Sequence, residues 1–173
     1  MEHFVNIEPQ KLDQSVFKLI GEDWALITIA GEDGSYNPMT VSWGGLGVLW
    51  GKNVCFAFIR PQRYTYEFAE RENATWTFSF FPEKYHDALG FCGKNSGRDV
   101  DKVKACNLTP ENLAHGGIGY KEANLIIEAK KLYSDDIRES RFFDRSLLRH
   151  YAKSDYHRMY ICEICDIYRK EEL

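Results

Sequence analysis

The residues over positions 37–47 (NPMTVSWGGLG) combine small hydroxyl side chains, one aromatic ring and three glycines. On an extended chain Thr40 and Ser42 point to the same face, where their hydroxyls and nearby N–H groups could bond the polar edge of a flat ring. The glycines leave a face that the strand cannot fill itself, so a ligand or another backbone can approach closely. A glycine-rich bulge at the corner of a barrel has the same composition, so this segment alone leaves both interpretations open.

A second segment, residues 60–66 (RPQRYTY), lies where a predicted strand ends and a predicted helix begins. It brings Arg60, Arg63 and Thr65 to the start of that helix. The free N–H groups of a helix start, the helix dipole and two guanidinium groups all favour a phosphate dianion. The alternative is a solvated basic cap on an ordinary helix.

The third segment, residues 93–102 (GKNSGRDVDK), adds cations to a chain that is acidic overall: Lys94, Arg98 and Lys102. Ser96 and Asp99 form a capping-box-like pair that predicts the start of a helix, and the glycines make the loop permissive. A plain surface loop is the alternative. Together the three segments offer a platform for a flat ring and two cationic, donor-rich loops, which is what a flavin phosphate requires.

Familiar nucleotide fingerprints are absent from the sequence. The glycines after Gly45 are spaced wrongly for G-x-G-x-x-G, and the P-loop-like run at residues 90–95 has the wrong spacing and lacks a hydroxyl residue after its lysine. Cys162 and Cys165 form a C-x-x-C, but on a strand their side chains point to opposite faces, and no second pair of Cys or His accompanies them. We expect a structural or incidental role for these two thiols and therefore predict no metal site. A redox or metal-binding role is the alternative.

Composition limits the class of protein. The chain has 173 residues, 44% of them hydrophobic and 14% aromatic, which fits a single domain over residues 1–173 with a real core. A net charge of −4 and a pI near 5.8 disfavour a general nucleic-acid binder. We find neither a long apolar run nor a signal peptide, so we expect no membrane association. The odd count of five cysteines then indicates reduced thiols in the cytoplasm.

Hydrophobic periodicity predicts a mostly β chain with short helices (α+β), in the form of a closed or partly closed antiparallel barrel. The first three predicted strands are joined by short turns and form a meander. The predicted strands cover residues 24–30, 39–49, 54–59, 74–80, 124–133 and 159–168. The predicted helices cover residues 62–72, 82–92, 99–106 and 146–153, with one more short helix beginning at Thr109.

The three segments, with Ser79-Phe80-Phe81 between them, resemble in order and spacing the flavin reductase-like family, especially its flavoredoxin branch. The resemblance spans residues from about 20 to 168. It implies an FMN-binding split β-barrel, usually a homodimer with the flavin near the subunit interface. One departure is Cys162, where the family pattern suggests glycine.

The resemblance also implies a set of cofactor-binding residues. Those that would border the flavin ring are Thr40, Val41, Ser42 and Trp43, with Met39 beside them. Those that would serve the phosphate and ribityl end are Arg60, Arg63, Tyr64 and Thr65. Those that would close over the cofactor are Ser96, Gly97, Arg98 and Lys102, with Cys92 and Gly93 beside them. His157, just before the last predicted strand, could line the same pocket or be a packed, hydrogen-bonded core residue.

No nucleophile–base pair is needed, because in this family the flavin carries the chemistry and the protein positions and tunes it. The main hypothesis is an NAD(P)H-dependent flavin or flavoprotein reductase that transfers hydride or electrons through bound FMN. The alternative is a flavoredoxin-type electron carrier that receives electrons from a protein partner and has no pyridine-nucleotide site of its own. A third reading is a non-catalytic barrel that binds FMN or haem.

Overall fold

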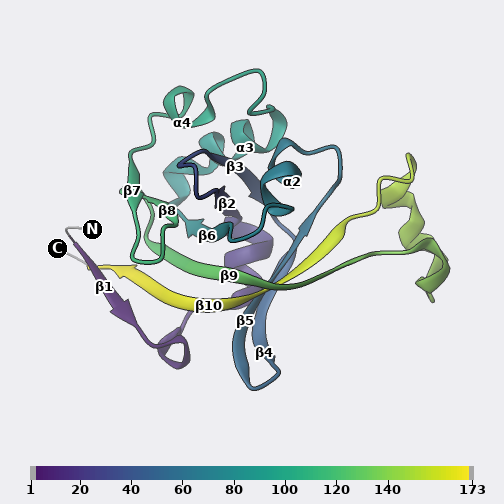
Figure 1. Ribbon diagram of the computed structural model, residues 1–173, viewed down its shortest axis with the longest axis horizontal. Helices are drawn as coiled ribbons and strands as arrows, with labels where there is room; N and C mark the ends of the chain where they lie inside the picture. The colour runs from purple at the N-terminus through teal and green to yellow at the C-terminus, as the bar shows by residue number, and fades with distance from the viewer. Residues whose placement is uncertain (1–2, 172–173) are drawn as a thin grey trace.

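The computed structural model describes residues 3–171 and is built around one antiparallel sheet of eight strands (Figure 1). Its strands pair in the order β3-β2-β6-β9-β10-β5-β4, and β1 pairs with β10. The strands of this sheet are β1 (Phe4–Ile7), β2 (Ala25–Ala30), β3 (Tyr36–Val41), β4 (Gly44–Leu49), β5 (Lys52–Ile59), β6 (Thr75–Phe80), β9 (Leu125–Asp136) and β10 (Arg158–Lys170). A small second sheet pairs β7 (Pro110–Asn112) with β8 (Ile118–Tyr120).

Short helices lie beside the sheet. The α-helices are α1 (Val16–Lys18), α2 (Tyr64–Ala69), α3 (His86–Lys94) and α4 (Lys102–Ala105). The 3-10 helices are Pro9–Lys11, Glu83–Tyr85, Glu139–Arg141 and Arg145–Tyr151, and Leu19–Asp23 forms a π-helix. In Figure 1, α2, α3 and α4 lie together on one side of the long strands β9 and β10. None of the helices in the described part of the chain is long and apolar enough to cross a membrane.

The chain closes the barrel by crossing from one edge strand to the other. β3 and β4 stand at opposite ends of the strand order, yet Ser42 and Trp43 join them directly. The single strand predicted over residues 39–49 is therefore wrong, and so is the meander, because β3 pairs with β2 whereas β4 pairs with β5. Gly44 allows the close approach at this corner: a Cβ there would lie 2.7 Å from the carbonyl oxygen of Phe56.

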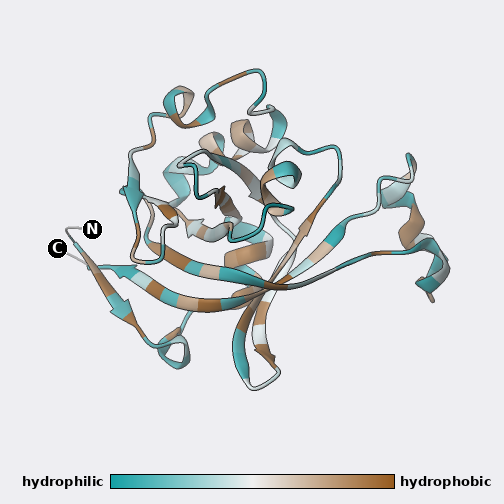
Figure 2. Cartoon of the chain, in the orientation of Figure 1, coloured by the Kyte–Doolittle hydropathy of each residue, from teal (hydrophilic) through white to brown (hydrophobic). Residues whose placement is uncertain are grey.

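The strands that carry the longest apolar runs are buried on both faces. All six residues of β2 are buried, because Ile27 and Ile29 join the larger core whereas Leu26 joins a second core beside α3 and α4. Along β9 and β10, hydrophobic and hydrophilic residues alternate (Figure 2). Trp76 and Tyr160, at 4.9 Å between ring centroids, are the largest aromatic contact of the main core. The predicted strands 24–30, 74–80, 124–133 and 159–168 are thus confirmed within a few residues.

Several predicted helices differ from the structure. The helix expected from Thr109 is wrong, because residues 110–112 form β7, whose partner strand at 118–120 no local pattern reveals. The helix expected over 99–106 shrinks to α4, and Asp101 caps it by accepting from the Lys104 N–H at 3.1 Å. Ser96 instead accepts the Arg98 N–H within its own loop, so the capping-box prediction is also wrong. The helix expected over 146–153 is a 3-10 helix.

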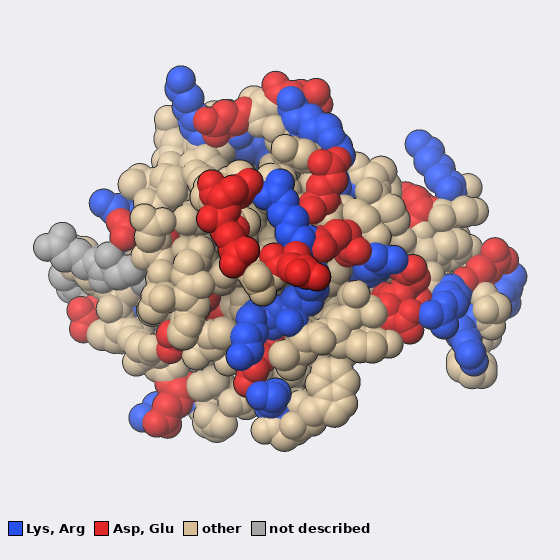
Figure 3. All heavy atoms as spheres, in the orientation of Figure 1, with Lys and Arg blue, Asp and Glu red and all other residues tan. Residues whose placement is uncertain are grey.

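Residues 137–157, which we call the arm, connect β9 to β10 and project from the barrel at the end opposite the two chain termini (Figure 1). Phe143 on the arm is fully exposed, and Leu147 is 40% exposed. Elsewhere, acidic and basic side chains intermingle over the face shown in Figure 3 and form no continuous basic surface there.

Candidate functional site

Two neighbouring cavities meet at Arg63. The first, the Trp43 cavity, has a volume of about 200 Å³ and is lined by Met39, Thr40, Val41, Ser42, Trp43, Phe58, Arg60, Arg63 and His157. The second, the Lys102 cavity, has a volume of about 190 Å³ and is lined by Asn37, Gln62, Arg63, Tyr64, Thr65, Gly93, Lys94, Asn95, Ser96, Gly97 and Lys102. The structure therefore brings together residues from all three sequence segments.

The Trp43 cavity lies where the chain passes from β3 to β4. Trp43 is 44% exposed and its indole packs against His157, with 5.1 Å between ring centroids. Thr40 donates its hydroxyl hydrogen to the carbonyl oxygen of Leu89 at 2.6 Å, so this side chain also holds α3 against β3. Its oxygen lone pairs still allow it to accept a bond. The cavity thus combines an aromatic wall with the polar backbone edge of a strand.

His157 is a buried residue of the Trp43 cavity, with 7% of its surface exposed. Its Nδ1 lies 3.0 Å from the hydroxyl of Tyr151. Burial, reinforced by the charges of Arg60 and Arg63 and opposed by Asp155, lowers the pKa of His157 to about 4. The imidazole is therefore neutral at pH 7. The two readings that the sequence left open both hold in part, since His157 is packed and hydrogen-bonded and also lines the cavity.

Arg60 belongs to the Trp43 cavity and holds the arm in place. Its guanidinium forms an ion pair with Asp155 at 2.6 Å, donates to the carbonyl oxygen of His150 at 2.9 Å and lies 5.1 Å from the ring centre of Tyr151. Arg60 does not line the Lys102 cavity, where the sequence placed it together with Arg63. The guanidinium of Arg60, which was expected to bind a phosphate, is thus already paired with the carboxylate of Asp155.

The Lys102 cavity is lined by two cations that the rest of the described chain does not neutralise, the buried Lys102 and the half-buried Arg63. Lys102 is 3% exposed, and its ammonium donates to the carbonyl oxygen of Cys92 at 3.4 Å. Burial lowers its pKa to about 8, an effect that nearby Cys92 opposes and Arg63 reinforces. Burial also lowers the pKa of Arg63, with Arg60 adding to the effect. Neither cation forms a salt bridge within residues 3–171.

Uncompensated buried charge is costly, so the buried ammonium of Lys102 beside the half-buried guanidinium of Arg63 suits a site for an anion. An arginine and a lysine together suit a phosphate, which accepts several charge-assisted hydrogen bonds. The electrostatics of the Lys102 cavity therefore fit the phosphate of a nucleotide-like ligand. The Trp43 cavity beside it fits the flat part of such a ligand.

The loop at 93–101 is pressed against β3 and α2. A Cβ on Gly97 would lie 1.9 Å from Oδ1 of Asn37 and 3.1 Å from the ring of Tyr64, so this position requires glycine. Asn37 in turn donates to the hydroxyl of Thr65 at 2.6 Å. Thr65 is 1% exposed, so its hydroxyl helps to fix the cavity wall.

Arg98 and Cys92 occupy other places than the sequence suggested. Arg98 forms an ion pair with Glu67 and lies over the ring of Tyr64, 4.7 Å from its centre. It lines an adjoining open hollow, which shares Asn37, Tyr64, Gly97 and Lys102 with the Lys102 cavity. Cys92 is fully buried and contributes its carbonyl oxygen to Lys102. The other residues that the sequence predicted for the cofactor site line one of the two cavities.

Some lining residues were missed. Asn37, Gln62 and Asn95 stand within the three segments, but their types alone gave no reason to single them out. Lys94, which the sequence identified as a cation of the third segment, also lines the Lys102 cavity. Phe58 reaches the Trp43 cavity from β5, and no local signal distinguishes it from the core residues of that strand. Only the fold reveals its position.

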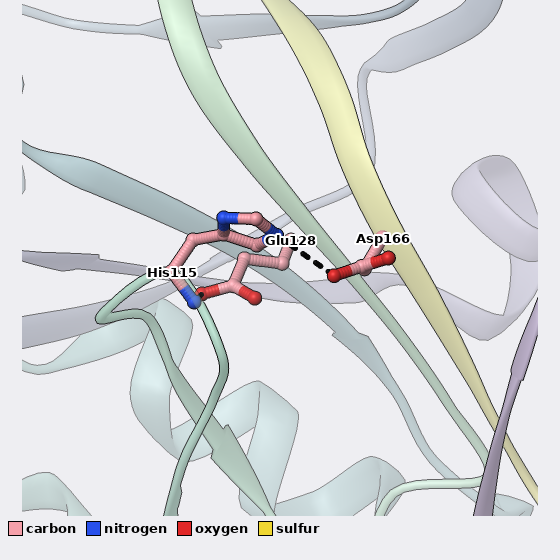
Figure 4. Close-up of side chains that lie close together, drawn as sticks. All are labelled: His115, Glu128 and Asp166. Atoms are coloured by element: carbon pink, nitrogen blue, oxygen red, sulfur yellow. Dashed lines mark hydrogen bonds and ion pairs between the residues drawn. The ribbon is translucent and has the colours of Figure 1, made fainter.

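A separate cluster lies outside both cavities, on the side of β9 and β10 that faces the β7–β8 connection (Figure 4). His115 Nε2 and Asp166 Oδ2 are 2.8 Å apart, and potential ligand atoms of His115, Asp166 and the buried Glu128 lie within 4.8 Å of one another. Glu128 accepts the N–H groups of His115 and Gly117 at 3.1 and 2.8 Å and the hydroxyl of Tyr168 at 3.0 Å. These bonds satisfy the buried carboxylate and tie the connection to the main sheet.

Comparison with known proteins was informative at the level of structure. No family model and no curated protein sequence matches the chain. Among solved structures, the chain is similar to the flavoredoxin of Desulfovibrio vulgaris (Miyazaki F), with 20% identity, a TM-score of 0.66 and coverage of 95% of this chain and 78% of that one.

Two Shewanella structures are also similar. The FMN-binding domain of a flavin reductases-like enzyme from Shewanella baltica matches with 14% identity, a TM-score of 0.68 and coverage of 96% and 77%. A protein with a split barrel domain from Shewanella frigidimarina matches with 18% identity, a TM-score of 0.68 and coverage of 96% and 76%. At these identities the likeness establishes the fold. The predicted fold class, a mostly β split barrel with short helices, is confirmed.

Proposed function

We propose that the chain binds one FMN non-covalently, with the phosphate in the Lys102 cavity and the ring system in the Trp43 cavity. The observation that carries this proposal is a pair of cations without a salt bridge in the described chain, the buried Lys102 and the half-buried Arg63, beside a cavity with an aromatic wall. The FMN-binding proteins among the structural neighbours support it further.

The residues divide between the two ends of the ligand. Arg63 and Lys102 neutralise the phosphate, and the loop that carries Ser96 and Gly97 closes over it. At the other end, residues 39–43 border the ring system. Arg60 serves this end indirectly, because it holds the arm, and with it His157, against the cavity.

Bound FMN supplies hydride and electron transfer, and the protein positions the cofactor and tunes it. The hydroxyl of Tyr151 lies 3.0 Å from Nδ1 of His157, and in the tautomer in which this hydroxyl donates, the ring hydrogen is on Nε2. In that tautomer His157 offers a neutral N–H donor to a ligand in the Trp43 cavity. We assign the chain the role of an FMN-dependent oxidoreductase, an NAD(P)H-dependent flavin or flavoprotein reductase.

The size of the Trp43 cavity favours a second candidate, a flavoredoxin-type electron carrier. At about 200 Å³ the cavity lies below the usual range of roughly 300–1,000 Å³ for small-molecule sites, which leaves little room for a nicotinamide beside a flavin. Anaerobic mixing of the FMN complex with NADH or NADPH separates the candidates. Bleaching of the flavin within the time of turnover supports the reductase, whereas a flavin that bleaches with a chemical reductant alone supports the carrier.

We also propose a homodimer. Val48, Trp50 and Tyr133 are exposed near the β4–β5 turn, with 6.1 Å between the rings of Trp50 and Tyr133, and Phe143 projects from the arm. Exposed aromatic clusters of this kind mark interfaces, and two-fold dimers are the commonest oligomers. Light scattering at micromolar concentration should give twice the chain mass, and Trp50→Glu should shift it toward the monomer. A wild-type monomer with FMN bound would refute the dimer.

The FMN proposal is tested by titrating the ligand-free protein with FMN and with riboflavin, which lacks the phosphate. Two charge-assisted contacts to the phosphate, each contributing about 1.5–3 kcal/mol, predict an FMN preference of at least about tenfold. Equal affinities would refute the phosphate site. Failure to bind either compound would refute the proposed function.

A further inference from the structure

Two thiols lie in contact at the ends of the loop that closes the Lys102 cavity. The sulfur atoms of Cys92 and Cys106 are 3.8 Å apart. Cys92 is fully buried near the end of α3, whereas Cys106, directly after α4, is partly exposed. The segment between them carries the residues that line the cavity from this side.

Both cysteines also hold Lys102. The backbone N–H of Cys106 donates to the carbonyl oxygen of Lys102 at 3.0 Å, and the ammonium of Lys102 donates to the carbonyl oxygen of Cys92 at 3.4 Å. A change in the distance between the two sulfur atoms therefore acts on both the backbone and the ammonium of Lys102.

We propose that Cys92 and Cys106 form a redox modification site, at which hydrogen peroxide closes a disulfide that draws Lys102 away from the cavity and weakens the binding of a phosphate there. The effect on the ligand rests on the proposed function, whereas the formation of the disulfide does not.

The reaction is balanced by one peroxide. The sulfur of Cys106, the more exposed of the two, attacks one oxygen of hydrogen peroxide, so the O–O bond breaks and Cys106 becomes a sulfenic acid while one water leaves. The sulfur of Cys92 then loses its proton and attacks the sulfur of Cys106. The S–S bond forms, the S–O bond breaks and a second water leaves. The two thiols are oxidised by two electrons and the peroxide is reduced by two.

The chemistry assigns the two roles in this order. Burial raises the pKa of Cys92 to about 12, so its thiol stays protonated and is poorly placed to meet the oxidant first. Because its sulfur contacts that of Cys106, Cys92 is the thiol that attacks the sulfenic acid and completes the disulfide, without a second molecule that supplies a thiol.

The consequence for Lys102 follows from the direction of the movement. A disulfide requires the sulfur atoms to come from 3.8 Å to about 2.05 Å. This pulls α4 toward the end of α3 and shortens the contact between the ammonium of Lys102 and the carbonyl oxygen of Cys92. An ammonium that bonds this carbonyl more closely is withdrawn from a ligand in the cavity.

The remaining cysteines offer contrasts. Cys55 and Cys162 are cross-strand partners on β5 and β10, but both are fully buried, so an oxidant does not reach them. Cys165 is partly exposed, as Cys106 is, and its sulfur contacts the carbonyl oxygen of Glu163. Cys165→Ser therefore removes an accessible thiol without touching the proposed pair, and it is the matched control for Cys106→Ser.

The experiment treats the reduced full-length protein with hydrogen peroxide and maps disulfides by mass spectrometry of unreduced peptides. We expect the intact chain to lose two hydrogen atoms and the peptides of Cys92 and Cys106 to be linked, in the wild type and in Cys165→Ser. Cys106→Ser should yield no linked peptide. A wild-type map without this link would overturn the proposal.

The affinities of the reduced and oxidised proteins for FMN and riboflavin test the consequence. Oxidation should weaken FMN about tenfold, the loss of one charge-assisted hydrogen bond, leave riboflavin unchanged, and be reversed by dithiothreitol. A linked wild-type protein with unchanged FMN affinity would overturn the effect on Lys102. If the reduced protein binds FMN and riboflavin equally, the proposed function fails, and the peptide map still decides the disulfide.

Discussion

The buried ammonium of Lys102 should lower the stability of the ligand-free protein while it strengthens FMN binding. Its pKa falls from 10.5 to about 8 on folding, chiefly because of burial. At about 1.4 kcal/mol per pKa unit, keeping it charged in the folded state costs up to about 3 kcal/mol. Lys102→Met keeps most of the chain length and removes this cost. We therefore expect the ligand-free variant to be more stable than the wild type at pH 7, by up to about 3 kcal/mol.

The same substitution should weaken FMN. Loss of one charge-assisted contact to the phosphate costs about 1.5–3 kcal/mol, or roughly 10- to 150-fold in affinity. Riboflavin, which makes no such contact, should bind both proteins equally. Stability and affinity thus change in opposite directions at one residue.

The pH dependence has a defined sign. Between pH 8 and pH 10.5 the unfolded chain binds more protons at Lys102 than the folded protein does, so the stability of the wild type rises with pH in this window. The gain is absent from Lys102→Met. FMN affinity of the wild type should fall as pH rises through about 8, because the free site then loses its ammonium proton.

Denaturant melts of the ligand-free proteins and fluorescence titrations with FMN measure both effects. Lys104→Met is the matched control, since Lys104 lies on the same short helix, is exposed and does not line either cavity. It should change neither quantity. If Lys102→Met binds FMN as the wild type does, the ammonium does not meet the phosphate. If it destabilises the ligand-free protein, the bond to Cys92 is structural and the reasoning about burial is wrong.

Other predictions follow from single contacts. Gly97→Ala should displace the loop and reduce FMN binding at least about tenfold, because its Cβ would clash with Asn37. Gly90→Ala, with open space around its Cβ, should bind FMN as the wild type does, and titrations of both variants with FMN test this. His157 should stay neutral, so the affinity for riboflavin, which has no phosphate that titrates in this range, should be flat from pH 5 to 7, and a titration step near pH 6.5 would contradict the pKa of about 4. Arg60→Ala should release the arm, seen as faster hydrogen exchange over 137–157, while the preference for FMN over riboflavin remains; loss of that preference would place Arg60 at the phosphate.

The hydrophobic pattern of the sequence predicted the buried strands, because this pattern depends only on residues that are close together in the chain. β2 and β6 are apolar or alternating over their whole length, and burial on one or both faces enforces that pattern. Pairing is not local. The corner at Ser42 and Trp43 looks like part of a strand, and only the close approach of Gly44 to Phe56 on the neighbouring strand β5 shows that the chain has turned there. The same limit explains β7, whose partner strand lies beyond an intervening turn.

The residues of the candidate site could be predicted where the residue type alone determines the role. They could be predicted less well where the role depends on which other side chain the residue pairs with. Lys102 and Arg63 were selected as cations, and the structure leaves both without carboxylates in the described chain. Arg60 and Arg98 were selected for the same reason, yet each is paired with an acid. Asp155 lies 95 positions from Arg60, and Glu67 lies 31 positions from Arg98. The order of charges along the sequence therefore could not reveal that these cations were already neutralised.

The two cavities adjoin the seam of the barrel, and this placement has a physical reason. A barrel closed by hydrogen bonds throughout has no free strand edges, but here the chain crosses from β3 to β4 and those two strands do not pair with each other. Backbone N–H and C=O groups on these two edges do not bond each other across the seam, so they need partners other than a strand. In the proposed complex, a flat ligand with polar atoms on its rim would supply such partners, with Trp43 at one end and the cations of the Lys102 cavity at the other. The interruption between β3 and β4 is thus the place in the barrel where the proposed FMN would fit.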